Sequence, residues 1–177
     1  MHKFILIVLL LTLSRLGYSQ GSDYNFDENA SFKERIRVGG DFALNFGTIT
    51  YINFAPRIGY LVKPKLLMGF GASYSYLQDK RFDLEFTNYG ALVFGQYQIL
   101  ENVILQTEYH QLSALTYSQF TGERIRVPVE ILFVGGSYRL ELGNYSFGYV
   151  SIMYDVIGDI NSPYQNPYFG GGLMFGF

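Results

Sequence analysis

Large apolar residues alternate with small or polar residues along most of the chain, from about residue 35 to its end. In residues 66–77, for example, every even position holds Leu, Met, Phe, Ala or Tyr, whereas Gly and Ser occupy most odd positions. This period of two indicates β-strands, because successive side chains of a strand point to opposite faces of a sheet. The pattern predicts eight strands, at residues 35–46, 51–62, 66–77, 88–99, 103–115, 128–141, 145–156 and 167–177.

The predicted strands are too long and too uncharged for an ordinary soluble sheet. Most span 11 to 13 residues, about twice the usual strand length, and a tilted strand needs roughly 9–11 residues to cross a bilayer. The stretches 66–77, 88–99 and 167–177 contain no Asp, Glu, Lys or Arg, so in water they would expose broad apolar bands. Residues 35–177 are therefore predicted to form an all-β domain, a closed antiparallel eight-stranded transmembrane β-barrel.

The sixth strand has the least regular pattern. Val129, Ile131 and Phe133 share one phase, but Tyr138 and Leu140 share the other. Two glycines at positions 135 and 136 lie between these groups. A β-bulge inserts one extra residue and switches the phase of a strand, so we expect a bulge at this glycine pair.

The connections between the strands alternate in length. Short links at 63–65, 100–102 and 142–144 are separated by longer polar links at about 79–87, 116–127 and 157–166, with the short link 47–50 as the exception. Short periplasmic turns and longer extracellular loops are typical of bacterial outer-membrane barrels. The segments 120–126 and 159–166 are predicted loop tips, where an envelope protein partner would bind.

The first 34 residues have a different character. Lys3 precedes an apolar run at residues 4–13, and small residues follow at Gly17 and Ser19. This order is typical of a secretory signal peptide, so residues 1–19 are predicted to be cleaved off. Residues 20–34 are polar and acidic without a consistent period, which indicates a short N-terminal tail.

Composition removes several classes of function. The chain has 13 Lys and Arg against 15 Asp and Glu, a formal charge of −2, so it lacks the positive field that holds nucleic acid. It has no Cys, and His110 is the single His outside the predicted signal peptide. These counts exclude disulfides, thiolate metal sites and a multi-histidine metal site, and we expect neither a metal nor a cofactor.

Charged residues at positions predicted to face the barrel interior are the main candidate site. Eight strands enclose a space just wide enough for side chains to fill, and an unpaired buried charge is strongly destabilising. We therefore expect the arginines to pair with the acidic residues in an interior network, and the alternative is a gate or narrow ion path. The candidates are Arg37, Asp41, Arg57, Glu108, His110, Glu130, Arg139 and Asp155.

Glu108, His110 and Ser113 also invite a comparison with hydrolases. A serine nucleophile must contact its histidine base. Along a strand, however, positions that differ by three point to opposite faces, so His110 and Ser113 are predicted to lie apart. We expect that the protein is not an enzyme and has no catalytic residues.

Taken together, the chain resembles the small eight-stranded outer-membrane β-barrel proteins and is similar in plan to the OmpA transmembrane domain and OmpX. The predicted signal peptide followed by Gln20 resembles secreted proteins of Bacteroidota. The alternating Leu173, Phe175 and Phe177 resemble the C-terminal signature that the barrel-assembly machinery reads in this family. The resemblance implies a place in the outer membrane of a Gram-negative cell envelope, in contact with outer-membrane lipids.

The pattern limits the shape of the protein more than its task, because one fold carries many functions. The leading expectation is a structural, adhesion or envelope-assembly interaction role. The first alternative is a channel for small solutes or apolar molecules, and the second is a lipid-modifying outer-membrane enzyme. A soluble secreted ligand-binding barrel is disfavoured by the uncharged strands.

Overall fold

The computed structural model describes residues 31–82, 84–117, 123–143 and 145–177. The predicted signal peptide, 1–19, lies outside these residues, as does most of the predicted tail, 20–34. The described part of the tail ends in a single turn of 3-10 helix, η1 (Lys33–Arg35). Within the described ranges, no helix is both long and apolar enough to cross a membrane.

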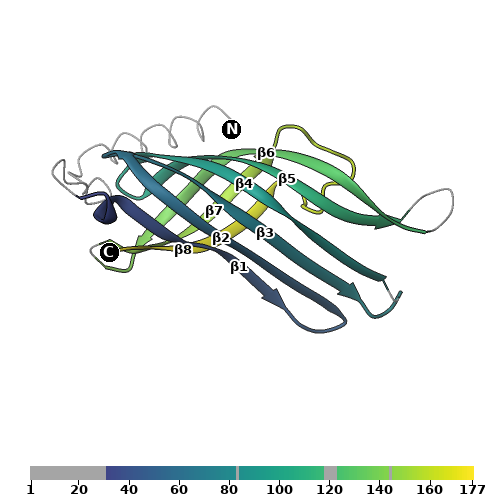
Figure 1. The fold of residues 1–177 in the computed structure, drawn as a ribbon. Helices are drawn as coiled ribbons and strands as arrows, with labels where there is room; N and C mark the ends of the chain where they lie inside the picture. The colour runs from purple at the N-terminus through teal and green to yellow at the C-terminus, as the bar shows by residue number, and fades with distance from the viewer. Residues whose placement is uncertain (1–30, 83, 118–122, 144) are drawn as a thin grey trace, which may run out of the picture.

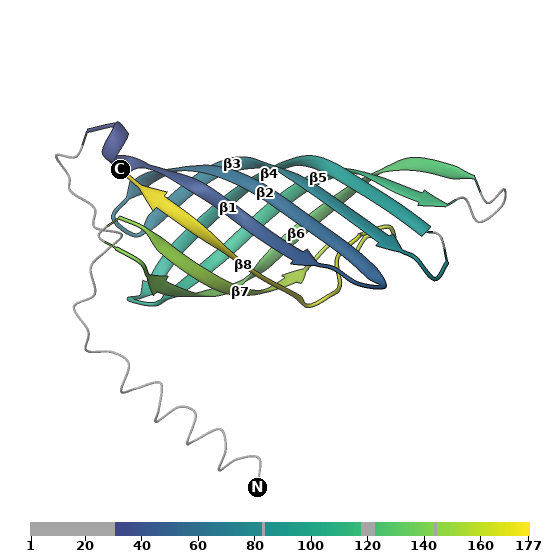
Figure 2. The same cartoon turned by 90° about the horizontal axis from the view of Figure 1, so that it is seen from below.

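The strands form one closed barrel in which each strand is antiparallel to its neighbours (Figures 1 and 2). Consecutive strands pair in order, and β8 closes the barrel by pairing with β1. The predicted closed antiparallel eight-stranded fold is therefore confirmed. The strands are β1 (Ile36–Asn45), β2 (Ile49–Lys63), β3 (Leu66–Asp79), β4 (Leu84–Leu100), β5 (Val103–Tyr117), β6 (Arg124–Glu141), β7 (Phe147–Asp155) and β8 (Tyr168–Gly176).

The two ends of the barrel differ. The end that carries η1, the C-terminus and the turns after β2, β4 and β6 is called the turn end, and the opposite end is called the loop end (Figure 1). At the loop end the strands are longer than predicted, since β3 and β4 pair as far as Asp79 with Leu84, and β5 and β6 as far as Tyr117 with Arg124. The sequence predicted loops here because these residues are polar. They are polar because this part of each hairpin extends past the apolar part of the barrel.

The mouth at the loop end is oblique. Strands β1, β7 and β8 have 9 or 10 residues, whereas β2 to β6 have 14 to 18. The pairing of β6 with β7 ends at Phe133 and Asp155, so the first part of β6 is paired with β5 alone. The β5–β6 hairpin consequently projects beyond the shorter wall (Figure 1).

The barrel is apolar outside and contains charges inside. Phe42, Phe70 and Phe169 point outward and are 61–70% exposed, whereas Arg57 and Glu108 point inward and are at most 5% exposed. The alternation predicted for residues 66–77 is confirmed, since the larger side chains of β3 at even positions point outward while Ser73 and Ser75 point inward and are buried. The outer face differs most from that of a soluble barrel, which exposes polar side chains to water.

The predicted bulge in the sixth strand is wrong. The register of β6 with β5 and with β7 runs without a shift through the glycine pair, so one phase holds along the whole strand. Val129, Ile131 and Phe133 therefore point into the barrel and are fully buried, whereas Glu130 points outward and is exposed. The prediction failed because the interior near the loop end is apolar, so apolar side chains belong inside there.

Candidate functional site

A buried ion-pair cluster occupies the middle of the barrel. The Arg57 guanidinium on β2 donates to both carboxylate oxygens of Glu108 on β5, with Nη1–Oε1 and Nη2–Oε2 distances of 2.5 and 3.0 Å. The same guanidinium pairs with the Asp41 carboxylate on β1. One arginine thus lies between two carboxylates, both predicted as partners, and the three side chains are almost fully buried.

Glu108 is the centre of a wider set of hydrogen bonds. It also contacts His110, with 2.8 Å between Oε2 and Nε2, and it accepts a hydrogen bond from Gln106. The Gln106 Oε1 atom in turn accepts from Gln96 Nε2 on β4 at 3.1 Å and from Ser137 Oγ on β6 at 2.6 Å. Uncharged side chains therefore connect the cluster to β4 and β6.

Asp41 anchors the cluster on the opposite wall. Its carboxylate accepts a hydrogen bond from the Tyr149 hydroxyl on β7. Gly172 on β8 leaves the room for this contact, since a Cβ atom there would come within 2.7 Å of the Tyr149 hydroxyl oxygen. The glycine is thus required for close packing inside the barrel.

Packed apolar residues lie on both sides of this polar layer. Toward the turn end, Leu61, Leu67, Ile104 and Phe147 are among the buried members of one hydrophobic cluster. Toward the loop end, a second cluster contains the inward-facing apolar residues of β6. A cavity of only about 10 Å³ is found beside the ion pairs, which is about the minimum space for one water molecule. Side chains therefore fill the space around the ion pairs.

Two predicted interior arginines are placed nearer the turn end. Arg37 is buried and donates from Nη1 to the backbone carbonyls of Glu34 and Ile36, at 2.7 and 2.9 Å. Arg139 is buried with its Nη2 atom 3.7 Å from Glu141. Neither of these contacts involves an acid named in the prediction, because both arginines lie at the barrel rim, where backbone carbonyls and half-exposed acids are within reach.

Asp155 is buried as predicted, but its contacts are with the backbone. Its Oδ1 atom accepts hydrogen bonds from the amides of Leu132 and Ile157, at 3.3 and 3.1 Å. The side chain therefore caps the end of β7 and the turn that follows it. Glu130, which was expected inside, lies on the outer wall instead.

The predicted separation of His110 from Ser113 holds. His110 is buried in the interior next to Glu108, whereas Ser113 belongs to the outward phase of β5. The arrangement therefore lacks the contact that a serine hydrolase needs. In the part of the chain that the structure describes, no group of three His, Cys, Asp or Glu side chains could hold a metal ion.

Sequence reasoning missed the uncharged members of the interior. Gln96, Gln106, Ser137 and Tyr149 are buried in the inward phase of their strands. They were overlooked because only charged residues were considered. A polar residue at an inward position, whether charged or not, is the signal that would have identified them, since buried polar groups need partners.

The β7–β8 loop closes part of the mouth. Tyr164, in this loop, places its hydroxyl 3.3 Å from Ser73 Oγ on β3, and its ring contacts His110, Phe133 and Tyr168. Burial raises the pKa of the Tyr164 hydroxyl above its ordinary value, because the phenolate would lose its hydration. Tyr164 therefore covers the loop-end side of the interior as a neutral side chain.

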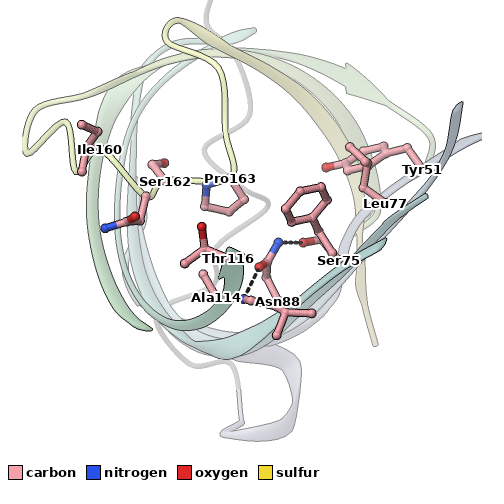
Figure 3. A pocket seen from close by; sticks show the side chains of 12 residues that line it. Tyr51, Ser75, Leu77, Asn88, Ala114, Thr116, Ile160, Ser162 and Pro163 are labelled. Atoms are coloured by element: carbon pink, nitrogen blue, oxygen red, sulfur yellow. Dashed lines mark hydrogen bonds between the residues drawn. The ribbon is translucent and has the colours of Figure 1, made fainter. Parts of the chain in front are cut away.

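Outside this cover lies a larger cavity of about 310 Å³, called the mouth cavity (Figure 3). One side is formed by the inner wall of β2 to β5, which contributes Tyr51, Phe86 and Thr116. The other side is formed by the β7–β8 loop, from which Ser162 and Pro163 point toward the hollow. The oblique mouth and the loop laid across it create this space.

The wall beside the mouth cavity contains a break in the sheet. The pairing of β4 with β5 ends at Asn88 and Ala114, although both strands continue and the same register would next join Thr87 to Leu115. The Leu115 amide instead donates to Asn88 Oδ1 at 3.2 Å. The Thr87 carbonyl accepts from the Arg126 guanidinium at 3.3 Å. We call this break the β4–β5 seam, and side chains hold it in place of backbone hydrogen bonds.

Searches against protein families and against curated proteins found no match to this chain.

Proposed function

We propose that the chain is an integral outer-membrane β-barrel protein with a structural or interaction role, and that it is not an enzyme. The observation that carries the proposal is the inverted distribution of side chains. Buried ion pairs occupy the middle of the interior, while Phe42, Phe70 and Phe169 are more than 60% exposed on the outside. Contact with lipid would remove these apolar surfaces from water. In water, exposed apolar surfaces of this kind favour aggregation.

The tyrosines of the outer wall support the same proposal. Tyr97 and Tyr138 lie beside the first residues of β3 and β5, close to the turn end. Tyr74 and Tyr89 form a cross-strand pair nearer the loop end, and Phe70 lies between these two levels. Two aromatic levels with apolar residues between them are typical of barrels that cross a bilayer, because tyrosine is stable at the headgroup level.

The loop end supplies the surface for an interaction role. The β5–β6 hairpin projects beyond the shorter wall (Figure 1). Phe46, Phe82 and Ile160 are 68–94% exposed in the connections at this end, and a partner that covered them would remove their apolar surface from water. These features fit adhesion or assembly with an envelope protein, and folding by the barrel-assembly machinery belongs to the same proposal.

Location is the first test. An epitope-tagged full chain, expressed in a Gram-negative host, should fractionate with the outer membrane and change its gel mobility on heating. Recovery as a freely soluble periplasmic protein would overturn the proposal.

Two further assays separate the alternatives. In planar bilayers the purified barrel should show no steady porin-sized currents, because packed side chains occupy the interior. Such currents would favour the channel alternative. Release of acyl chains from lipid A would favour the lipid-modifying enzyme, and its absence is expected because His110 and Ser113 lie in opposite phases.

A further inference from the structure

The described residues that line the mouth cavity are uncharged. Aromatic and aliphatic groups are provided by Tyr51, Phe86 and Pro163, and hydroxyl groups by Thr116 and Ser162. Among the described residues that line it, there is no Asp, Glu, Lys or Arg. A charged ligand would lose hydration in such a site without gaining an ionic partner. The lining therefore suits a neutral molecule with both an apolar face and hydroxyl groups.

Part of the lining is held in a fixed position. Asn88 is buried, and its Nδ2 atom donates to Ser75 Oγ at 3.1 Å while its Oδ1 atom accepts from the Leu115 amide at 3.2 Å (Figure 3). Polar groups that are already held by neighbours cost less conformational entropy when a ligand binds. The volume of about 310 Å³ is at the lower end of the range for small-molecule sites.

The seam makes one side of the cavity adaptable. From Asn88 toward the loop end, side-chain contacts connect β4 and β5. One of them is the edge-to-face contact of Phe86 with Tyr117, with 5.6 Å between the ring centroids. Side-chain contacts rearrange at lower cost than a backbone ladder, whose groups must all stay paired. A ligand could therefore widen this side without breaking the barrel.

The inner end of the mouth cavity is closed. Below it, Tyr164 contacts Ser73 and Phe133, and the apolar cluster near the loop end follows. A molecule that enters the mouth consequently meets a closed end, so the geometry is that of a binding site and not of a passage.

We propose that the mouth cavity binds a small uncharged molecule that combines an aromatic or apolar face with hydroxyl groups, such as a neutral monosaccharide with an aromatic substituent. The inference goes beyond the structural role proposed above. It does not depend on the membrane location, because the cavity is formed by the loop-end strands and the β7–β8 loop alone. Failure of either proposal therefore leaves the other standing.

The test uses a fluorescent reporter inside the cavity. The chain contains no Trp, so the variant Phe86→Trp places a single indole in the lining. The refolded full chain is titrated in zwitterionic detergent with phenyl β-D-glucoside and, separately, with phenyl β-D-glucuronide, which differs by one carboxylate. We expect a saturable fluorescence change with the glucoside and at least tenfold weaker binding of the glucuronide. Equal affinities would overturn the proposal.

Matched variants of the loop locate the binding. Ser162→Phe fills the cavity, whereas Gln165→Phe adds the same ring to an exposed position of the same loop. The first variant should lose the saturable signal, and the second should keep it. Ligand-observed saturation-transfer NMR on the unmodified chain and on these two variants gives a readout that does not require the Trp. Binding by Ser162→Phe equal to that of the unmodified chain, or no saturable binding by either method, would refute the site.

Discussion

Arg57 on β2 and Glu108 on β5 are joined by two hydrogen bonds, of 2.5 and 3.0 Å, although their strands are not neighbours in the sheet. The contact therefore spans the interior of the barrel. With Asp41 and Tyr149 it links strands β1, β2, β5 and β7 through side chains alone. Such a link resists deformation of the barrel cross-section, which backbone pairing between adjacent strands does not by itself fix.

The first prediction concerns this link. Arg57→Met leaves Asp41 and Glu108 as uncompensated buried acids, so it should reduce the free energy of unfolding by about 3–5 kcal/mol. The double variant Arg57→Met with Glu108→Gln should lose less than the sum of the single variants. Urea unfolding of the refolded barrel in lipid vesicles measures both, and strictly additive losses would show that the pair is not coupled.

The second prediction compares two glutamates of opposite facing. Glu108→Gln removes a buried charge from its contacts with Arg57 and His110, so a loss of several kcal/mol is expected. Glu130→Gln alters an exposed side chain of the outer wall near the loop end. An acid on the outer face near the membrane surface costs at most about 1 kcal/mol, so no loss or a small gain in stability is expected. The same unfolding assay compares the two, and similar losses would mean that Glu130 does not face outward.

A third prediction tests the outer face. Phe70 is 61% exposed on β3, and Phe70→Arg should cost about 2–4 kcal/mol if this position lies near the middle of the bilayer. Ser73→Asn, on the inward face of the same strand, should be tolerated better. Refolding yield and stability in lipid vesicles give the ranking. The reverse order would contradict the assignment of lipid to the outside.

The fourth prediction concerns the β4–β5 seam. Asn88→Ala removes the acceptor of the Leu115 amide. Without this hydrogen bond, local opening of the sheet at the seam should expose the amide to solvent more often. Hydrogen exchange at Leu115 should accelerate about tenfold or more, since an unmade buried hydrogen bond costs roughly 1–3 kcal/mol. The Gln111 amide, within the paired part of β5, is the control. Unchanged exchange at Leu115 would mean that the side chain does not protect it.

Much of the architecture could be read from the chain. The period of two located all eight strands, and their lengths and missing charges indicated a closed transmembrane barrel. In residues 66–77 the alternation separated the two faces of the strand correctly. These properties are local, because strand geometry fixes which neighbours share a face.

Alternation could not predict which face of β6 points into the barrel. Val129, Ile131 and Phe133 have the same pattern whether they face lipid or an apolar interior, and only the cluster formed with residues of β5 and β7 decides between the two. The contacts of Asp155 were misjudged for a related reason. Its nearest donors are backbone amides at the end of β7 and in β6, and such groups carry no signature in the sequence.

The sequence by itself therefore determined the strands, their order and most of their faces. The tertiary structure decided which interior groups meet, as in the contact between Arg57 and Glu108, and how the long strands, the seam and the β7–β8 loop enclose the mouth cavity. The physical reason is the range of the interactions. Alternation acts between adjacent residues, whereas the contacts of Arg57 with Glu108 and of Asp41 with Tyr149 join side chains 51 and 108 residues apart. The partners of these side chains are set by the closure of the barrel.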